Sequence, residues 1–197
     1  MFSIECEGIR KRYLKEVLFK DFNFTFEQGN SYAILGYNSS GKSTLLKIVA
    51  GILTPTKGSI QFSEGEPHTE ISFCSPELYL LEDYTVKELI DFHYQFRQPK
   101  ISIKEQIKEA ALQPFLNKKY STLSSGLKNK VKLALALFSD TPALLLDEPC
   151  TNFDDSNTKW YQEMIKKYCL NQLLIVASNQ TSEYNFCKEE IHLQDFK

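Results

Sequence analysis

The sequence predicts an α/β fold with a parallel sheet, an antiparallel β layer and an inserted helical subdomain. Three short apolar runs, at 32–35, 143–146 and 173–177, have the length of buried strands, and a helical pattern follows each of them. Buried strands that alternate with helices indicate a parallel sheet covered on both faces. Alternating apolar residues near the N-terminus and a cluster of helix-start signals in mid-chain predict the other two parts.

The antiparallel layer is predicted from two N-terminal segments in which every second residue is apolar. These residues are Ile4 and Cys6 in the first segment and Phe22, Phe24 and Phe26 in the second. Strict alternation is typical of a half-buried strand. Two further short strands are expected at 59–62 and 71–74.

The helical subdomain is predicted from helix-start signals. Thr85 and Glu88 have the spacing of a capping box, and apolar residues follow at helical spacing. A second helix is expected from Ser102, and Pro114 interrupts the pattern after it. A third helix is expected to begin near Ser124.

These patterns predict one domain over 1–197, with a core of 1–76 and 140–197 and a helical subdomain of 77–139. In the last third, the patterns predict a helix at 157–169, a short helix, and a closing strand at 191–193.

The composition is that of a globular protein: 197 residues, 42% hydrophobic and 24% charged. With a net charge of −2 the chain has no overall excess of basic residues, so no nucleic-acid partner is expected. No apolar run approaches the ~20 residues that cross a bilayer, and the N-terminus lacks the apolar segment of a signal peptide, so we expect a cytoplasmic chain. The five cysteines are far apart, which favours reduced thiols over a disulfide framework or a zinc site.

A phosphate-binding loop is predicted at 36–44, where GYNSSGKST matches G-x-x-x-x-G-K-[ST]. Gly36 and Gly41 allow the tight turn that points N–H groups at phosphate oxygens, Lys42 supplies a positive charge, and Ser43 offers a hydroxyl to Mg²⁺. An apolar strand precedes the loop, and a helical pattern closed by Gly51 follows it. This context favours a P-loop nucleoside triphosphatase core over the alternative, a solvated Gly/Ser turn.

The second motif is ALLLDEP, in which two acids follow the buried strand at 143–146. The carboxyl end of such a strand is where ligands bind in a parallel sheet. In a phosphate-loop enzyme Asp147 would support Mg²⁺, and Glu148 could orient or deprotonate the attacking water. The alternative is an acidic turn after a core strand.

With these motifs in order, nearly the whole chain resembles the ATP-binding subunit of ABC transporters. The signature motif of that family corresponds to LSSGL at 123–127, and its D-loop corresponds to TNFD at 151–154. The resemblance implies ATP and Mg²⁺ as ligands, and two chains that clamp two ATP molecules head to tail.

The resemblance also implies a role for each matching residue. The nucleotide-binding residues are Tyr13, Gly36, Tyr37, Asn38, Ser39, Ser40, Gly41, Lys42, Ser43 and Thr44, with Tyr13 stacked on adenine. The catalytic residues are Glu148 and Lys42, and the Mg²⁺ ligands are Ser43 and Asp147. The signature residues that contact the partner chain's nucleotide are Ser124, Ser125 and Gly126, and Asp154 is the aspartate of the D-loop.

Simpler alternatives exist for three of these positions. Tyr13 could be a surface aromatic residue. Ser124 could be only a helix N-cap, although the positive end of a helix is also what would face a phosphate. Asp154 or Asp155 could merely cap the next helix.

Five positions depart from the family pattern and bear on turnover more than on binding. One of them is Leu127, which replaces the amide residue that usually ends the signature motif. Ser39 replaces a glycine, and a serine fits there if the position does not need a positive φ. Ser125 replaces another glycine, beside the partner's nucleotide. Glu77 stands near the position of a glutamine that helps hold Mg²⁺, and Asn179 near that of a histidine that touches the γ-phosphate. An amide can donate a hydrogen bond but cannot carry a proton or a positive charge.

The sequence therefore predicts an ATP-hydrolysing subunit that drives a separate membrane permease from the cytoplasmic face of the membrane, paired with a second ATP-binding subunit. Residues 77–99 are expected to face the permease. A weaker resemblance points to the haem-exporter ATPase of cytochrome c maturation. Two alternatives remain open: a weakly active, nucleotide-sensing subunit of a heterodimer, and a soluble ABC-type ATPase without a transport role.

Overall fold

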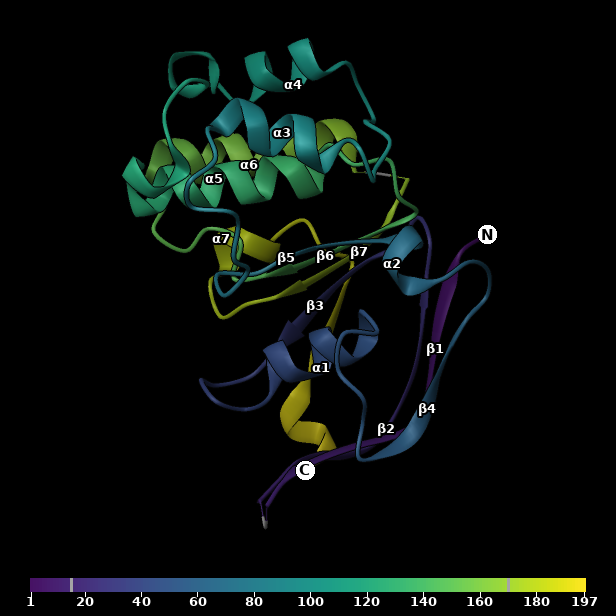
Figure 1. Cartoon of the computed structure of the whole chain (residues 1–197). Helices are drawn as coiled ribbons and strands as arrows, with labels where there is room; N and C mark the ends of the chain where they lie inside the picture. The colour runs from purple at the N-terminus through teal and green to yellow at the C-terminus, as the bar shows by residue number, and fades with distance from the viewer. Residues whose placement is uncertain (15, 170) are drawn as a thin grey trace. The chain divides into compact units, whose positions relative to one another are not determined.

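The computed structural model describes residues 1–14, 16–169 and 171–197, and these residues form two compact units (Figure 1). The core unit comprises 1–73, 141–148 and 170–197. The helical unit comprises 74–140 and 149–169. The predicted boundaries at 76/77 and 139/140 stay a prediction, and the helical unit also includes a segment from the last third of the chain.

The antiparallel sheet of the core unit has the strand order β2-β1-β4, with β1 at Ser3–Tyr13, β2 at Glu16–Glu27 and β4 at Lys57–Phe62. Ile4 pairs with Phe26 and Cys6 pairs with Phe24. The predicted alternation is confirmed, because Ile4, Cys6 and Phe26 are buried. Both N-terminal strands run longer than the alternating residues alone indicate.

The parallel sheet has the order β5-β6-β7-β3-β8. Its strands are β3 (Ser31–Leu35), β5 (Ile71–Cys74), β6 (Ala143–Asp147), β7 (Leu173–Ala177) and β8 (Glu189–His192). β3 runs parallel to β7 and β8, and β6 runs parallel to β7. Every residue of β6 and β7 is buried, as their uninterrupted apolar runs predict.

Within the described residues, three short helices and one longer helix complete the core unit. They are α1 (Lys42–Val49), α2 (Pro67–Glu70), α7 (Thr181–Tyr184) and the 3₁₀ helix η3 (Leu193–Phe196). The closing strand ends at His192, one residue before the predicted end, because the buried Leu193 already begins η3.

One apolar core joins both sheets and α1. The aromatic rings of β2 contribute much of it: Phe24 and Phe26 each meet the Tyr32 ring edge to face, with ring centroids 5.5 and 5.2 Å apart. Phe22 meets Phe196 of η3 in the same way at 4.8 Å. These contacts hold the antiparallel sheet and the C-terminal segment against the strand that leads into the phosphate loop.

The helical unit contains α3 (Val86–His93), α4 (Ile103–Glu109), η1 (Gln113–Phe115), η2 (Tyr120–Thr122), α5 (Ser125–Leu137) and α6 (Asp155–Tyr168). α5 packs against both α3 and α6 (Figure 1). The predicted caps are confirmed: Thr85 and Glu88 form a capping box, and Ser102 and Ser124 are N-caps. α6 begins two residues earlier than predicted, because Asp154 caps it.

A partly buried lysine joins two helix ends of this unit. Lys100 Nζ donates to the carbonyl oxygens of Leu137 and Tyr168, the last residues of α5 and α6, at 3.1 and 3.2 Å. A cation at two helix C-termini is favourable because the carbonyls there carry partial negative charge.

Among the described residues, no helix is long and apolar enough to cross a membrane.

Candidate active site

The phosphate loop of the core unit connects β3 to α1, as predicted. Gly41, at φ +106°, is the residue before α1, and a Cβ there would lie 3.2 Å from the Phe19 ring. A Cβ on Gly36 would lie 2.7 Å from Ser40 Oγ. Only glycine fits at both positions, and the loop leads into the N-terminus of α1, where free N–H groups favour an anion.

Ser39 has a left-handed backbone with φ +64°. The condition under which the sequence allowed a serine, a position without positive φ, is therefore not met. A left-handed conformation costs a non-glycine residue about 1–2 kcal/mol. The loop keeps Ser39 despite this strain, in a segment where strained residues often serve function.

Lys42 lies folded over its own loop. Its Nζ donates to the carbonyl oxygens of Gly36 at 2.9 Å and Tyr37 at 3.3 Å, and the residue is 5% exposed. Burial lowers the pKa of Lys42, while the negative charges of Glu148 and Asp147 oppose that shift. The side chain thus places a cation inside the curve of the loop, where a phosphate chain would need it.

Ser43 and Asp147 meet although they are far apart in the sequence. Ser43 Oγ donates to Asp147 Oδ1 at 2.9 Å, and Asp147 is buried at the end of β6. A hydroxyl and a carboxylate beside a phosphate loop are the oxygen donors that Mg²⁺ prefers. The residues present therefore fit a magnesium ion.

Glu148 follows Asp147 with a strained backbone, φ +43°, and its N–H donates to Ala177 O at 2.9 Å. It lines one pocket together with the residues of the loop. The pocket is lined by Leu18, Asn38, Ser39, Gly41, Lys42, Ser43, Thr44 and Glu148. Leu18 was missed by sequence reasoning, since an apolar residue of β2 carries no motif signal.

Asn179, which follows the buried strand β7, contacts the phosphate loop directly. Its Nδ2 donates to Asn38 Oδ1 at 2.7 Å. Sequence reasoning placed each asparagine at the site but offered no signal for their pairing across 141 positions.

The turn that carries Asn179 is held by a buried pair that the sequence analysis missed. Ser178 Oγ donates to the Glu183 carboxylate and accepts from Gln180 N at 2.9 Å. Both Ser178 and Glu183 are fully buried.

Two tyrosines at the core unit's surface lie under lysines. Tyr13 ends β1 and is 49% exposed, with Lys11 Nζ 5.2 Å from its ring centroid. Tyr37 is more exposed, with Lys197 Nζ 4.6 Å from its ring centroid and in contact with its hydroxyl. Adenine stacking by Tyr13 and a nucleotide contact from Tyr37 stay predictions.

In the helical unit, the predicted signature and D-loop residues lie at helix starts. Ser124 Oγ accepts from Leu127 N at 3.3 Å, and Ser125 and Gly126 form the first turn of α5. Asp154 Oδ1 accepts from Asn157 N at 2.8 Å and thereby caps α6. Both capping alternatives are therefore present, and the roles toward a partner's nucleotide stay predictions.

The segment after β5 is held in place by a buried lysine. Lys132 Nζ of α5 donates to the carbonyl oxygens of Ser75 at 3.3 Å and Pro76 at 2.8 Å. The next residue, Glu77, is exposed. A buried lysine in mid-helix has no motif signal, so sequence reasoning missed it.

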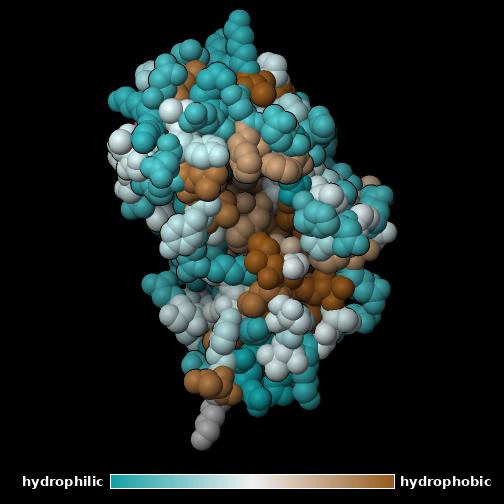
Figure 2. Space-filling model, in the orientation of Figure 1, coloured by the Kyte–Doolittle hydropathy of each residue, from teal (hydrophilic) through white to brown (hydrophobic). Residues whose placement is uncertain are grey.

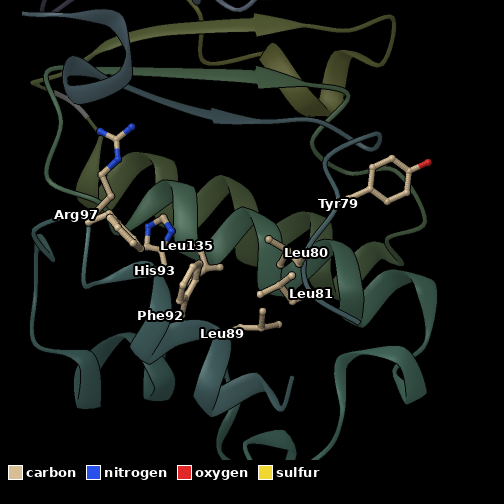
Figure 3. A pocket seen from close by; sticks show the side chains of 9 residues that line it. Tyr79, Leu80, Leu81, Leu89, Phe92, His93, Arg97 and Leu135 are labelled. Atoms are coloured by element: carbon tan, nitrogen blue, oxygen red, sulfur yellow. The ribbon is translucent and has the colours of Figure 1, made fainter. Parts of the chain in front are cut away.

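An apolar groove is lined mostly by residues of the predicted permease-facing region. Figure 3 shows its lining, in which Tyr79 points away from the groove at one end and Arg97 lies at the other. The lining residues are Tyr79, Leu80, Leu81, Leu89, Phe92, His93, Phe96, Arg97 and Leu135. Tyr79 is 91% exposed and Phe96 is 74% exposed, and Figure 2 shows hydrophobic side chains among the hydrophilic ones at the molecular surface.

Comparison with known proteins decides the family. The family model described as ABC transporter matches residues 19–151, a span that contains the phosphate loop, the signature turn and ALLLDEP. The chain belongs to the ABC transporter family. It binds ATP and is an ATPase subunit of such a transporter.

Individual relatives resemble the chain over most of its length. It is 29% identical to the uncharacterized ABC transporter ATP-binding protein YybJ of Bacillus subtilis, over 82% of this chain and 78% of that protein. It is 28% identical to the cytochrome c biogenesis ATP-binding export protein CcmA of Wolbachia pipientis, over 93% and 92%.

Solved structures share the fold at low identity. A putative ABC transporter ATP-binding protein from Pyrococcus furiosus superposes with a TM-score of 0.82 at 22% identity, over 99% of both chains. The dimeric bacterial cassette MJ0796 superposes with a TM-score of 0.83 at 23% identity, over 96% of this chain and 93% of that one. The α/β fold with its parallel and antiparallel sheets and its helical part is thereby confirmed.

Proposed function

We propose that this subunit binds MgATP at the phosphate loop and hydrolyses it with Glu148, paired with a second ATP-binding subunit. It would drive a separate integral-membrane permease from the cytoplasmic face of the membrane. The observation that carries the proposal is the 2.9 Å hydrogen bond between Ser43 and Asp147, beside the buried Lys42. Lys42 and Ser43 of the loop thus lie beside Asp147, which follows Ser43 by 104 positions in the sequence.

Each residue of the loop has a role that its position supports. Lys42 would exchange its bonds to two loop carbonyls for charge-assisted bonds to the β- and γ-phosphates. The N–H groups of residues 38–44 would bind phosphate oxygens at the start of α1. Ser43 and Asp147 would hold Mg²⁺, which when bound neutralises the charge on those oxygens.

Glu148 is the residue placed to act on water. It lines the same pocket as Lys42 and Ser43, and it follows the buried Asp147 directly. A carboxylate in that place would orient the attacking water and accept its proton. The hydrogen bond from Glu148 N–H to Ala177 O holds the backbone of Glu148 against β7, which fixes the position of its Cα.

The helical unit supplies the surfaces toward partners. Ser124, Ser125 and Gly126 begin α5, whose positive end suits the γ-phosphate of a nucleotide held by the second subunit. The groove that includes Phe92 and Phe96 is proposed as the permease contact, because aromatic residues are enriched in protein interfaces.

A second candidate function is a nucleotide-sensing subunit with slow turnover, paired with a more complete ATPase chain. Asn179 favours it, because an amide bound to Asn38 replaces the imidazole expected at the γ-phosphate. Ser125 adds a hydroxymethyl group in the signature turn, and it favours the same candidate function.

The permease assignment is tested by photo-cross-linking in cells. A photoreactive residue at Tyr79 or Phe96 should capture a protein with several membrane-spanning segments, identified by mass spectrometry. Lys20 and Glu64, exposed in the core unit, are the matched control positions. Capture of the membrane protein only from Lys20 or Glu64 would show that the groove is not the permease contact.

A further inference from the structure

Asn129 is a buried amide in the middle of α5, whose contacts fall outside the motifs described above. It is 4% exposed, and its Nδ2 donates to the carbonyl oxygens of Pro149 at 2.8 Å and Thr151 at 3.0 Å. Asparagine is a weak helix former, so α5 gains no helical propensity from it. The side chain instead satisfies two backbone acceptors in the segment that follows Glu148.

Two neighbouring residues of α5 contact the same stretch of chain. A Cβ on Gly126 would lie 2.6 Å from Asn152 O, so the backbones there approach as closely as glycine allows. Lys130 Nζ donates to Asn157 Oδ1 at 2.8 Å and lies 4.5 Å from the Trp160 ring centroid. The signature helix is therefore joined to residues 149–160 at three successive points.

We propose that Asn129 is a positioning residue that sets the register between the signature turn at 124–126 and the segment 149–154. The signature turn is expected to face the partner subunit, so this inference rests on the proposed paired function. Asn129 holds the signature turn and the segment 149–154 as one surface. The partner subunit, with its own nucleotide bound, docks on this surface. Misplacement by about 1 Å of groups that surround a reacting centre can cost on the order of a hundredfold in rate.

The hydrogen-bond geometry makes the inference specific to the amide nitrogen. Asn129→Asp keeps the shape but replaces the donor with a carboxylate oxygen that faces two carbonyl oxygens. Asn129→Ala removes the donor without adding repulsion, in case the aspartate variant does not fold. Asn129→Gln keeps the amide and should rescue part of the effect. Asn117→Asp is the matched control, because Asn117 lies exposed in a turn of the same unit.

The test combines hydrogen exchange of the purified chain, titration with a fluorescent ATP analogue, and phosphate release. In Asn129→Asp and Asn129→Ala, amide exchange at 150–153 should rise at least tenfold and kcat should fall at least tenfold. The Kd for the analogue should stay within twofold of wild type, since the phosphate loop belongs to the core unit. Asn117→Asp should match wild type in all three measurements.

Unchanged exchange at 150–153 in both variants would overturn the inference. So would a uniform loss, in which exchange rises throughout the helical unit and kcat and affinity fall together, because that pattern indicates only a structural role. If wild type releases no phosphate, the proposed hydrolysis has failed, and the exchange at 150–153 alone decides whether Asn129 holds this segment.

Discussion

The predicted functional residues of the core unit and of the helical unit make different kinds of contact. In the core unit, residues from distant segments meet each other: Ser43 bonds Asp147, and Asn38 bonds Asn179. In the helical unit, Ser124 and Asp154 each cap the helix that follows them, through hydrogen bonds from Leu127 N and Asn157 N.

The helical unit also exposes large aromatic side chains, of which Tyr79 and Phe96 are the most exposed. The difference indicates two kinds of ligand. A small anion needs convergent donors and a cation, which the core unit assembles by itself. A macromolecular partner needs exposed apolar surface, and the helical unit is where we propose that such a partner binds.

The largest expected effect comes from removing the cation of the core unit. Lys42→Ala should weaken binding of a fluorescent ATP analogue by about 10- to 150-fold, because a hydrogen bond to a charged group contributes about 1.5–3 kcal/mol. Lys20→Ala, an exposed change on β2, should bind as wild type does. Equal affinity in the two variants would mean that GYNSSGKST is only a turn, and the contrast between the units would disappear.

The next effect concerns the residue after β7. Asn179→His should raise the turnover number, because an imidazole can donate to charge that develops on the γ-phosphate. A lost contact of this kind typically costs about 2.7–4 kcal/mol, so partial restoration should be measurable as phosphate release. Gln180→His, at the exposed neighbouring position, is the control and should leave turnover unchanged.

If Asn179→His brings no gain, the limiting defect lies in the helical unit. Ser125 and Glu77 would then be the positions to change. Either result sharpens the comparison, since it shows which unit limits the turnover number.

The smallest expected effect is on stability. Ser39→Gly should raise the free energy of unfolding by about 1 kcal/mol, because glycine adopts positive φ without strain. Ser121→Gly, in the 3₁₀ helix η2, should lower it by roughly 0.5–1 kcal/mol. Urea unfolding measures both, and a loss of stability in Ser39→Gly would show that the serine hydroxyl, not backbone strain, decides this position.

Local sequence signals predicted most of the fold and the motif part of the site. The capping box at Thr85 and the caps at Ser102 and Ser124 were predictable because each depends on residues within one helical turn. The buried runs of β6 and β7 were predictable because a two-sided strand contains little else than apolar residues.

Contacts between distant segments could not be predicted in the same way. The pairing of Asn38 with Asn179 and the bonds from Lys132 to Ser75 depend on how the segments pack, and neither has a local pattern. The positive φ of Ser39 is also set by the closure of the loop rather than by the serine itself. Sequence motifs thus predicted the loop residues and Glu148 that line one pocket, but not which side chains touch.

The most direct test of the account is phosphate release by wild type and Glu148→Gln, each with size-exclusion chromatography in MgATP. We expect Glu148→Gln to bind ATP normally, to hydrolyse it at least about a hundredfold more slowly, and to form a dimer that ADP does not support. Equal rates of phosphate release in the two proteins would contradict the catalytic role of Glu148. A Glu148→Gln chain that stays monomeric in saturating MgATP would contradict ATP-dependent pairing between two copies of this chain.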